Sequence, residues 1–401
     1  MNRSIVIINQ YIGSPYHGME YRHYSLAKNL IARGYNVTLV SGSYSHLFST
    51  PPHTEGDFTR ETIEGIKYVW VKTPTYHSSK SLGRIWNMLV FAWKLRSLEV
   101  APAHILVSSP SLFPVKIGKK LAERFGTKFL FEVRDIWPLT LVELSSLSPT
   151  HPLIRLMARY ERFGYRHADK VISLLPAAQE HFVAHGMAPE KFVYLPNGIE
   201  IEEGETVPLP EEIQSQIPKD KFIVAYAGTI GIANNLGYLI EAAAMLQAET
   251  DIHFVLLGQG GEKPSLQNRV RELGLENVTF VEAVTKQMVG SFLDRVDVAF
   301  ISLLPEKLFR FGVSPNKVFE YMHAGKPILW AIEAGNNLIE EAQCGVSVPL
   351  GDAPRLVDAI EELHALTSDQ RTALGQNGYN FVTTHHGYAL LAEKLMKIIE
   401  G

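Results

Sequence analysis

Short apolar runs alternate with longer amphipathic segments over the whole length of the sequence. Parallel strands that are covered on both faces by crossover helices produce this alternation, because such strands are buried and the helices between them keep one apolar face. The sequence therefore predicts an α/β fold built on parallel sheets. The runs expected to form strands lie at 5–8, 37–40, 68–71, 104–107, 129–133, 171–175, 192–195, 222–227, 253–257, 278–281, 298–302 and 327–332.

A polar segment rich in proline and glutamate interrupts the alternation at 201–218, and it has the composition of a linker. We therefore expect one domain at 1–200 and a second at 219–384. Each is predicted to be a doubly wound, Rossmann-like parallel sheet, and the two are expected to face a cleft. A last helix, within 385–401, is expected to pack back on the first domain.

Charge is distributed unequally between the two halves. Residues 1–199 hold 23 Lys and Arg against 14 Asp and Glu, whereas residues 200–401 hold 15 against 28. A basic half indicates an anionic partner, for which an anionic phospholipid surface is the first candidate. Nucleic acid is less favoured, because no zinc, helix-turn-helix or RNA-binding pattern accompanies the basic residues.

The segment 78–98 combines tryptophans with cations and contains no acidic residue. This composition is typical of an interfacial helix on anionic lipid, and a core helix with a solvated basic face explains it equally well. The segment's cations are Lys80, Arg84, Lys94 and Arg96, and further cations follow at Lys116, Lys119, Lys120 and Arg124.

The rest of the composition is that of an ordinary globular protein, with 46% hydrophobic and 20% charged residues. The single cysteine, Cys344, cannot form an internal disulfide, which indicates a reducing compartment. Apolar stretches are too short for a signal peptide or a membrane span. We expect a cytoplasmic protein that contacts the inner face of the cytoplasmic membrane peripherally.

Ligands of open parallel sheets bind beyond the carboxyl ends of the strands, so the loops that follow strands are the candidate sites. Loop 10–22 contains Gly13 and Gly18, which permit close backbone approach, and polar His17, Glu20 and Arg22. A flexible loop without a ligand is the alternative. The segment 227–231 (AGTIG) lacks the spacing of a dinucleotide or P-loop motif and is a weak phosphate signal.

Segment 309–329 is the most informative loop and helix. Ser314 and Pro315 suit a helix start, with Pro315 at the first helical position, so that backbone amides and the helix dipole would favour an anion. Lys317 and Arg310 would add positive charge there. Glu320 would lie one turn inside the helix, placed to accept hydrogen bonds from ribose hydroxyls; a solvated surface glutamate is the alternative.

These segments together resemble a known family. The motifs are GVSPNKVFEYMHAGKPIL at 312–329, AGTIG at 227–231, GQGGEKPSL at 258–266, PNGIE at 196–200 and RDIWP at 134–138. They resemble the retaining glycosyltransferases of family 4, with the GT-B fold, over essentially the whole chain. Within that family the sequence looks most like the bacterial branch that builds surface polysaccharides, including transferases of N-acetylated amino sugars.

The sequence departs from the family pattern at several positions. Gly312 replaces the first glutamate of the E-x7-E motif, of which Glu320 is the second. Thr229 and Asn234 stand where the family commonly has an arginine and a lysine for the diphosphate, so Lys317, with Arg310, is our candidate replacement. A common histidine–aspartate pair is matched by Arg134 and Asp135.

The resemblance implies transfer of a sugar from a nucleoside diphosphate, expected to be UDP, to a saccharide or polyprenyl-diphosphate-linked acceptor with retention of configuration. No Asp-x-Asp sequence occurs, so neither a metal nor another cofactor is expected. The implied donor-binding residues are Glu320, Asn316, Ser314, Arg310, Gly228, Thr229, Gly231, Val284 and Gly13. The implied acceptor-binding residues are Tyr16, His17 and Arg22, and the implied catalytic residues are Asp135, Arg134 and Lys317.

Two alternatives stay open from the sequence. A nucleotide-sugar epimerase or a phosphorylase of the same fold needs further acid and base carboxylates or a pyridoxal phosphate lysine, which we do not identify. A catalytically inert sugar-nucleotide-binding subunit is compatible with Gly312, Thr229 and Asn234.

Overall fold

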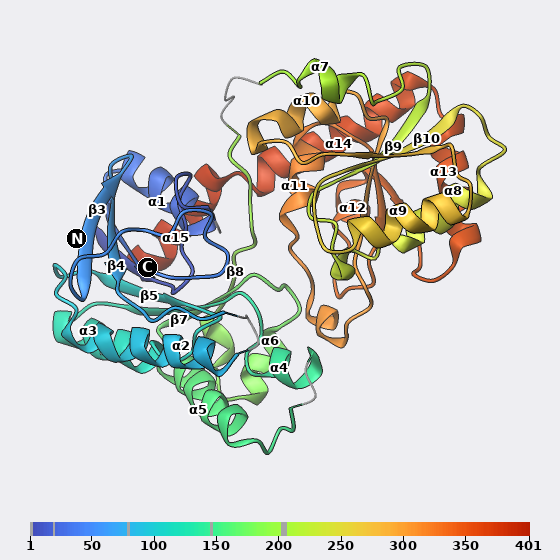
Figure 1. The fold of residues 1–401 in the computed structure, drawn as a ribbon. Coiled ribbons are helices and arrows are strands. Elements are labelled where there is room, and N and C mark those ends of the chain that lie inside the picture. Colours follow the sequence, from blue (N-terminus) through green and yellow to red (C-terminus); the bar gives the residue numbers. More distant parts are fainter. Residues whose placement is uncertain (1–2, 19–20, 78–80, 145–146, 202–206) are drawn as a thin grey trace. The chain divides into compact units, whose positions relative to one another are not determined.

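In the computed structural model, which describes residues 3–18, 21–77, 81–144, 147–201 and 207–401, the chain forms two compact units (Figure 1). Unit 1 comprises Met1–Glu200, Phe311–Ser314 and Tyr388–Gly401. Unit 2 comprises Ile201–Arg310 and Pro315–Gly387. The chain therefore enters unit 1 three times, and the short segment 311–314 belongs to it.

Unit 1 is built on an eight-stranded sheet in the order β3-β4-β2-β1-β5-β6-β7-β8. All neighbouring strands are parallel except β3, which pairs antiparallel with β4 at the edge. The polar sequence of β3 gave no strand signal. The strands are β1 (Ser4–Ile8), β2 (Asn36–Gly42), β3 (Phe58–Ile63), β4 (Ile66–Val71), β5 (His104–Ser108), β6 (Phe129–Val133), β7 (Lys170–Ser173) and β8 (Phe192–Tyr194).

Helices cover both faces of this sheet, because successive strand residues point to opposite sides. Ile5 and Ile7 of β1 pack toward α1 (Arg22–Ala32) and the last helix α15 (Tyr388–Glu400), whereas Val6 and Ile8 pack toward the opposite face. That second face is covered by α2 (Leu82–Lys94), α3 (Val115–Phe125) and α5 (Pro152–His167) (Figure 1). The shorter helices α4 (Leu139–Leu144) and α6 (Gln179–Ala184) lie in the connections after β6 and β7.

Unit 2 contains a six-stranded, wholly parallel sheet in the order β11-β10-β9-β12-β13-β14. Its strands are β9 (Phe222–Ala227), β10 (Ile252–Leu257), β11 (Val278–Val281), β12 (Val298–Ser302), β13 (Ile328–Ala331) and β14 (Gly345–Ser347). One face is covered by α8 (Gly237–Met245), α9 (Lys263–Glu272) and α13 (Ala353–Ala365). The prediction of an α/β fold with two parallel sheets is confirmed.

Further helices of unit 2 include α10 (Val289–Leu293), α11 (Asn316–His323), α12 (Leu338–Ala342) and α14 (Ser368–His385). Helix α14 was not predicted from the sequence, because its composition is largely polar. Its contact with the rest of unit 2 depends on small residues. A Cβ added at Gly375 would lie 1.8 Å from the Gly325 carbonyl oxygen, and one at Gly378 would lie 3.1 Å from the Cβ of Cys344.

Two local expectations need correction. Pro315 is the N-cap of α11 in extended geometry, and Asn316 is the first helical residue, because the φ and ψ of Pro315 are −73° and 129°. The expected linker contains a short helix, α7 (Glu211–Gln214), beside the region 202–206, which lies outside the described residues. No helix among the described residues combines the length and the apolar composition required to cross a membrane.

The segment 78–98 is only partly as expected. Helix α2 begins at Leu82, and Lys80 lies outside the described residues. Arg84 donates from Nε to the Tyr11 hydroxyl at 3.2 Å, and the Lys94 ammonium lies 2.6 Å from the Asp57 carboxylate. The positive charge of α2 itself is therefore largely occupied within the protein.

Candidate functional site

The carboxyl ends of β9, β10 and β11 form a close-packed edge in unit 2. The Gly228 amide donates to the Leu257 carbonyl at 2.9 Å, and the Gly258 amide donates to the Val281 carbonyl at 3.1 Å. A Cβ at Gly258 would lie 1.8 Å from the Gly228 carbonyl oxygen, and the φ of Gly258 is +149°. Only glycine fits there, so the two loops hold each other in place.

Lys317, in the first turn of α11, lies directly beneath the Gly228 loop. A Cβ at Gly228 would lie 2.2 Å from the Lys317 Cε. The ammonium donates to Asn234 Oδ1 at 3.2 Å and lies 5.3 Å from the centre of the Tyr226 ring. Burial lowers the pKa of Lys317, and the nearby Glu320 carboxylate partly opposes this shift. Lys317 is therefore a desolvated cation beside backbone amides, an environment suited to an anionic group.

Glu320 lies on the same helix as Lys317, three residues later. Its neighbours in α11 fix its direction: Val318, Phe319, Tyr321 and Met322 are buried. The Tyr321 hydroxyl donates to the Ala227 carbonyl at 3.1 Å and accepts from the Ala227 amide at 2.9 Å, which fastens α11 to the end of β9. The Glu320 side chain is 31% exposed and its carboxylate lies 4.0 Å from the Lys286 ammonium.

Burial raises the pKa of Glu320, although Lys286 and Lys317 act in the opposite direction. The raised pKa means that the surrounding protein does not fully compensate the charge of this carboxylate. Strong hydrogen-bond donors from a ligand would supply the compensation. Glu320 is thus a carboxylate prepared to accept hydrogen bonds.

Lys263 is a further residue of this edge, which the sequence did not predict. It lies at the start of α9, almost fully buried, and its ammonium donates to the Gly258 carbonyl at 3.1 Å and to Glu282 Oε1 at 2.7 Å. Glu282 follows β11 and directly precedes the loop that contains Val284. Lys263 therefore links the loop after β10 to the loop after β11. The only sign of this contact in the sequence was the presence of a lysine in the segment 258–266.

The other expected donor-binding residues are placed as follows. The Thr229 carbonyl accepts from the Tyr226 hydroxyl at 2.7 Å and from Asn234 Nδ2 at 2.9 Å, and Gly231 follows it at the start of a short 3-10 turn. Val284 is half-buried after β11, while Asn316 and Arg310 are exposed in unit 2. Ser314 belongs to unit 1, where its hydroxyl accepts from the Asn197 amide at 3.0 Å.

In unit 1 a buried charge network lies where β1, β5 and β6 end. The Glu132 side chain is completely buried and accepts from Arg22 Nη2 at 2.9 Å, His23 Nε2 at 2.8 Å and the Ser108 hydroxyl at 2.8 Å. Arg22 Nη2 also donates to the Leu195 carbonyl at 3.0 Å. Burial opposes ionisation, but Arg22 and His23 outweigh it and hold the pKa of Glu132 well below its ordinary value.

This network changes the role expected of Arg22. Its guanidinium is 2% exposed and is used by Glu132 and the strand-end carbonyls, so it supports the edge of the sheet from within. His17 is also buried, bonded through Nδ1 to the Ser14 hydroxyl at 2.7 Å and packed against Trp70 with ring centres 4.9 Å apart. Tyr16, in contrast, is 64% exposed.

The remaining expected residues of unit 1 lie at the same edge. Gly13 is buried, and its carbonyl accepts from the Tyr68 hydroxyl at 3.0 Å. Arg134 and Asp135 directly follow β6; the Arg134 amide donates to the Ser109 hydroxyl at 2.8 Å, and Asp135 is exposed. Among the described residues, no group of three or more His, Cys, Asp and Glu side chains is arranged to hold a metal ion.

Two family models match the chain. The model described as "Glycosyl transferase 4-like domain" matches residues 17–198, and the model described as "Glycosyl transferases group 1" matches residues 221–365. The chain is 23% identical to the glycosyl transferase WcaI of Escherichia coli, named for colanic acid biosynthesis, over 82% of this chain and 84% of WcaI. It is 26% identical to the alpha-D-kanosaminyltransferase of Streptomyces kanamyceticus, over 51% of this chain and 53% of that protein.

Solved structures share the fold. A trehalose-6-phosphate structure from E. coli, bound with UDP-2-fluoro glucose, has a TM-score of 0.75 at 12% identity and covers 99% of this chain and 98% of its own. The structure of HepE from Anabaena in complex with UDP and glucose has a TM-score of 0.65 at 17% identity and covers 99% of both chains. At these identities the comparison establishes the two-domain GT-B architecture.

Proposed function

Because the chain belongs to the group 1 glycosyltransferases of family 4, with the GT-B fold, we propose that it transfers a sugar from UDP to a lipid-linked saccharide with retention of configuration. The sugar we propose is an N-acetylated amino sugar. The product would be a bacterial O-antigen, capsule or exopolysaccharide. The main support for binding of a nucleotide-sugar donor is the arrangement of Gly228, Lys317 and Glu320 at the end of β9.

The proposed donor lies across the strand ends of unit 2. Its diphosphate would contact Lys317 and the amides at the start of α11, with Arg310 and Ser314 nearby in sequence. Its ribose hydroxyls would donate to Glu320. Its base would lie at the loop of Val284, which Lys263 fixes through Glu282. The complexes of HepE with UDP and of the trehalose-6-phosphate protein with a UDP-sugar analogue support UDP as the first nucleotide to test.

In the proposed reaction, the acceptor hydroxyl oxygen forms a bond to the anomeric carbon as the bond from that carbon to the diphosphate breaks. The acceptor proton moves to the leaving phosphate oxygen, so no side chain need act as the base. Lys317 stabilises the negative charge that develops on the diphosphate. Asp135 and Arg134 would orient the sugar or the acceptor at the edge of unit 1, with Tyr16 contributing to the acceptor site.

A panel of UDP- and GDP-sugars tests this proposal through donor hydrolysis, followed by transfer to a lipid-linked saccharide and determination of the product anomer. Turnover of one UDP-sugar with a retained anomer is the expected result. Binding of the donor without hydrolysis or transfer would favour an inert sugar-nucleotide-binding subunit. Formation of an isomer of the sugar, without transfer to the acceptor, would favour an epimerase.

The proposed reaction needs no divalent metal, because Lys317 and the helix amides supply the positive charge. Treatment with EDTA should leave the rate within about twofold, since the electrostatic stabilisation then comes from the protein. Activity that is lost on chelation and restored by magnesium or manganese would contradict metal independence.

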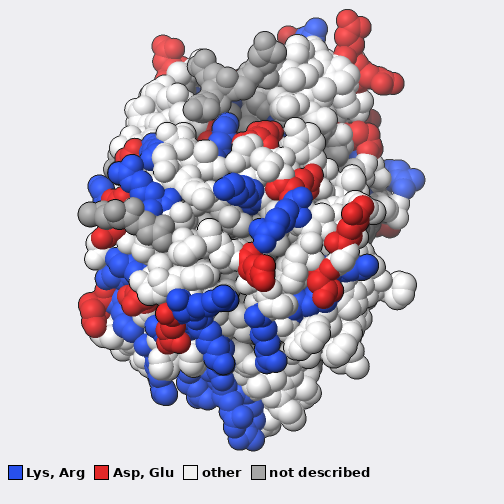
Figure 2. Space-filling model, turned by 90° about the vertical axis from the view of Figure 1, so that its left-hand side faces the viewer, with Lys and Arg blue, Asp and Glu red and all other residues white. Residues whose placement is uncertain are grey.

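A lipid-linked acceptor requires that the protein reach a membrane, and we propose peripheral association with anionic lipid through unit 1. Lys and Arg side chains gather on the lower part of the face that Figure 2 shows. Sedimentation with vesicles of phosphatidylglycerol tests it, with phosphatidylcholine vesicles as the control. Equal recovery in the supernatant with both lipids would contradict the association.

A further inference from the structure

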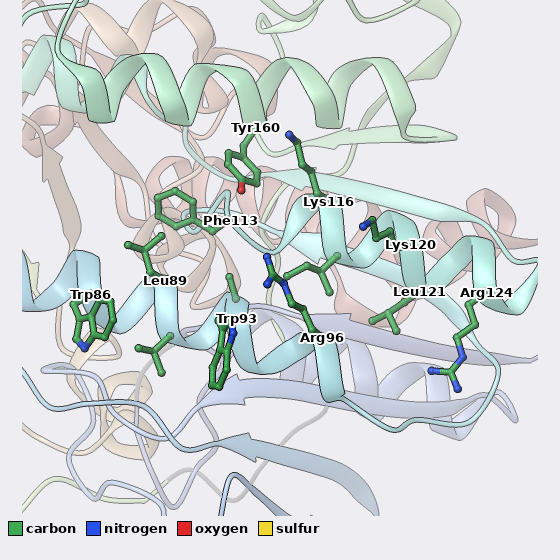
Figure 3. A pocket seen from close by; sticks show the side chains of 13 residues that line it. Trp86, Leu89, Trp93, Arg96, Phe113, Lys116, Lys120, Leu121, Arg124 and Tyr160 are labelled. Atoms are coloured by element: carbon green, nitrogen blue, oxygen red, sulfur yellow. The ribbon is translucent and has the colours of Figure 1, made fainter.

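A groove on the outer face of unit 1 is independent of the strand-end site. It lies between α2, α3 and α5, and has a volume of about 940 Å³ (Figure 3). We name it the α2–α3 groove; its lining residues include Trp86, Leu89, Trp93, Arg96, Lys120 and Arg124. This volume lies within the range of about 300–1,000 Å³ that is usual for small-molecule pockets.

The apolar part of the groove consists of large side chains that are exposed to solvent, although residues of these types are usually buried. Trp86 is 60% exposed and Trp93 is 61% exposed, and Leu89 between them is also accessible. The core face of α2 is already provided by Asn87, Met88, Phe91 and Ala92. The tryptophans are therefore not required for packing within unit 1, and an exposed apolar surface of this kind marks a binding site.

The charged part of the groove is entirely basic. None of its thirteen lining residues is acidic, and four are cations: Arg96, Lys116, Lys120 and Arg124. Within the part of the chain that the structure describes, no carboxylate lies within ion-pair distance of these four side chains. Lys116 instead lies over the Tyr160 ring, 4.8 Å from its centre.

The two parts occupy different ends of the groove. Helices α2 and α3 connect parallel strands, so both run from the carboxyl edge of the sheet toward its amino edge. Trp86 lies early in α2, whereas Arg96 follows its end and Arg124 lies in the last turn of α3. Figure 3 shows Trp86 and Leu89 at one end, with Arg96, Lys120 and Arg124 toward the other.

We propose that the α2–α3 groove binds a single anionic phospholipid of the bilayer, with an acyl chain along Trp86 and Leu89 and the phosphate at Arg96, Lys120 and Arg124. This inference rests on the proposed membrane association and adds to it a defined lipid site. A lipid-linked acceptor fits less well, because its diphosphate has to reach the carboxyl edge of the sheet, whereas the cations lie toward the amino edge.

Titration with a monomeric short-chain lipid separates this site from adsorption to a surface. Dihexanoyl phosphatidylglycerol, kept below its micelle concentration, is added to the full chain, and the emission of Trp86 and Trp93 reports on the groove. We expect saturable binding with a blue shift. Dihexanoyl phosphatidylcholine and glycerol 3-phosphate should each bind at least about tenfold more weakly. The choline cation of the first cancels the charge of its phosphate and is repelled by the basic groove, and the second has no acyl chain.

Two variants and a matched control assign the binding to the groove. The triple variant Arg96→Gln, Lys120→Gln, Arg124→Gln should weaken phosphatidylglycerol binding roughly 100- to 1000-fold, because each cation near an anionic lipid contributes about a factor of five to ten. Leu89→Asp should weaken it with only a small fall in the melting temperature, because Leu89 is 37% exposed and lies outside the core face of α2. The control Lys28→Gln, Lys67→Gln, Arg155→Gln removes the same charge from exposed positions elsewhere on unit 1.

Each other outcome overturns the proposal in a recognisable way. Binding to vesicles without binding of the monomeric lipid would leave the membrane association intact and remove the lipid site. Equal binding of glycerol 3-phosphate would leave only a phosphate site, and equal losses in the triple variant and its control would mean general charge attraction. Self-association that Leu89→Asp abolishes would identify a second copy of the chain as the occupant.

Discussion

Replacing Glu320 with glutamine is the most direct test of the donor site. The substitution keeps the shape of the side chain and removes its charge. Because Lys317 lies on the same helix and the Lys286 ammonium is 4.0 Å away, the change also removes the anionic neighbour of two cations. We therefore expect effects on donor affinity and on pH dependence, with little effect on folding.

The magnitude follows from the hydrogen bonds that a ribose would make. Hydrogen bonds to a buried charged group contribute about 1.5–3 kcal/mol each, roughly twice those between neutral groups. Glutamine can keep one acceptor but supplies no charge, so we expect a loss of about 1.4–2.8 kcal/mol, or about 10- to 100-fold. The contact exists in the ground state and in the transition state alike, so the loss should fall mainly on the KM for the donor.

The expected effect on stability has a definite sign. Burial raises the pKa of Glu320, so the folded state disfavours its ionised form relative to the unfolded chain. At pH values above the raised pKa this carboxylate therefore lowers the free energy of unfolding, and the effect disappears as the pH falls below its ordinary value. Glutamine is neutral at every pH, so the melting temperature of the variant at neutral pH should be equal to or slightly above that of the parent.

Donor KM, kcat and melting temperature, all measured on the same preparation, provide the assay. Glu340→Gln, an exposed position in the first turn of α12, is the matched control and should change none of them. An unchanged KM in the Glu320 variant would refute the ribose contact. A large fall in its melting temperature would show that the partners of Glu320 lie within the protein.

The remaining predictions concern the loops and charges around these residues. Gly228→Ala should weaken donor binding because its Cβ would lie 2.2 Å from the Lys317 Cε, whereas Gly237→Ala, with nothing within 4 Å, should have no effect on the measured donor KM. The ratio kcat/KM should fall at acid pH as Glu320 is protonated, and this fall should begin above the ordinary pKa of glutamate. It should also fall at alkaline pH as Lys317 loses its proton, and this fall should begin below the ordinary pKa of lysine. A pH series on the parent enzyme measures both limbs. Glu132→Gln should lower the free energy of unfolding by about 3–5 kcal/mol, measured by denaturant titration, because it leaves a buried guanidinium without its anion. The stability that Glu132 contributes should be present above its ordinary pKa and should be lost as the pH falls through the depressed value of the folded state.

Most of the architecture could be predicted from the sequence, because periodicity reports on burial. The runs that became β1, β5 and β9 are apolar on both faces, as buried parallel strands require. Strand β3 and helix α14 escaped prediction for the opposite reason. The edge strand β3 is mostly exposed, and α14 packs through the backbone at Gly375, so neither presents an apolar stripe.

The donor loop could also be predicted in part. The position of Glu320 one turn inside α11 follows from local spacing. The contacts of Lys263 and Arg22 do not, because each links segments that are distant in the sequence. Arg22 bonds to Glu132, and only the fold brings the start of α1 beside β6. From the sequence, a polar residue in a loop that follows a strand looks the same whether it faces a ligand or supports the sheet edge from within.

The direction of the pKa shift distinguishes these two cases. Glu132 is fully buried and Glu320 is partly buried, yet the pKa of the first is lowered and that of the second is raised. Glu132 has an arginine and a histidine in direct contact, so its charge is compensated inside the protein and its role is complete without a ligand. Glu320 and Lys317 are shifted toward their neutral forms, because burial weakens both charges more than their neighbours strengthen them. A ligand that brings hydroxyl donors to the first and an anion to the second would reverse both shifts, and a nucleoside diphosphate carries both groups in one molecule.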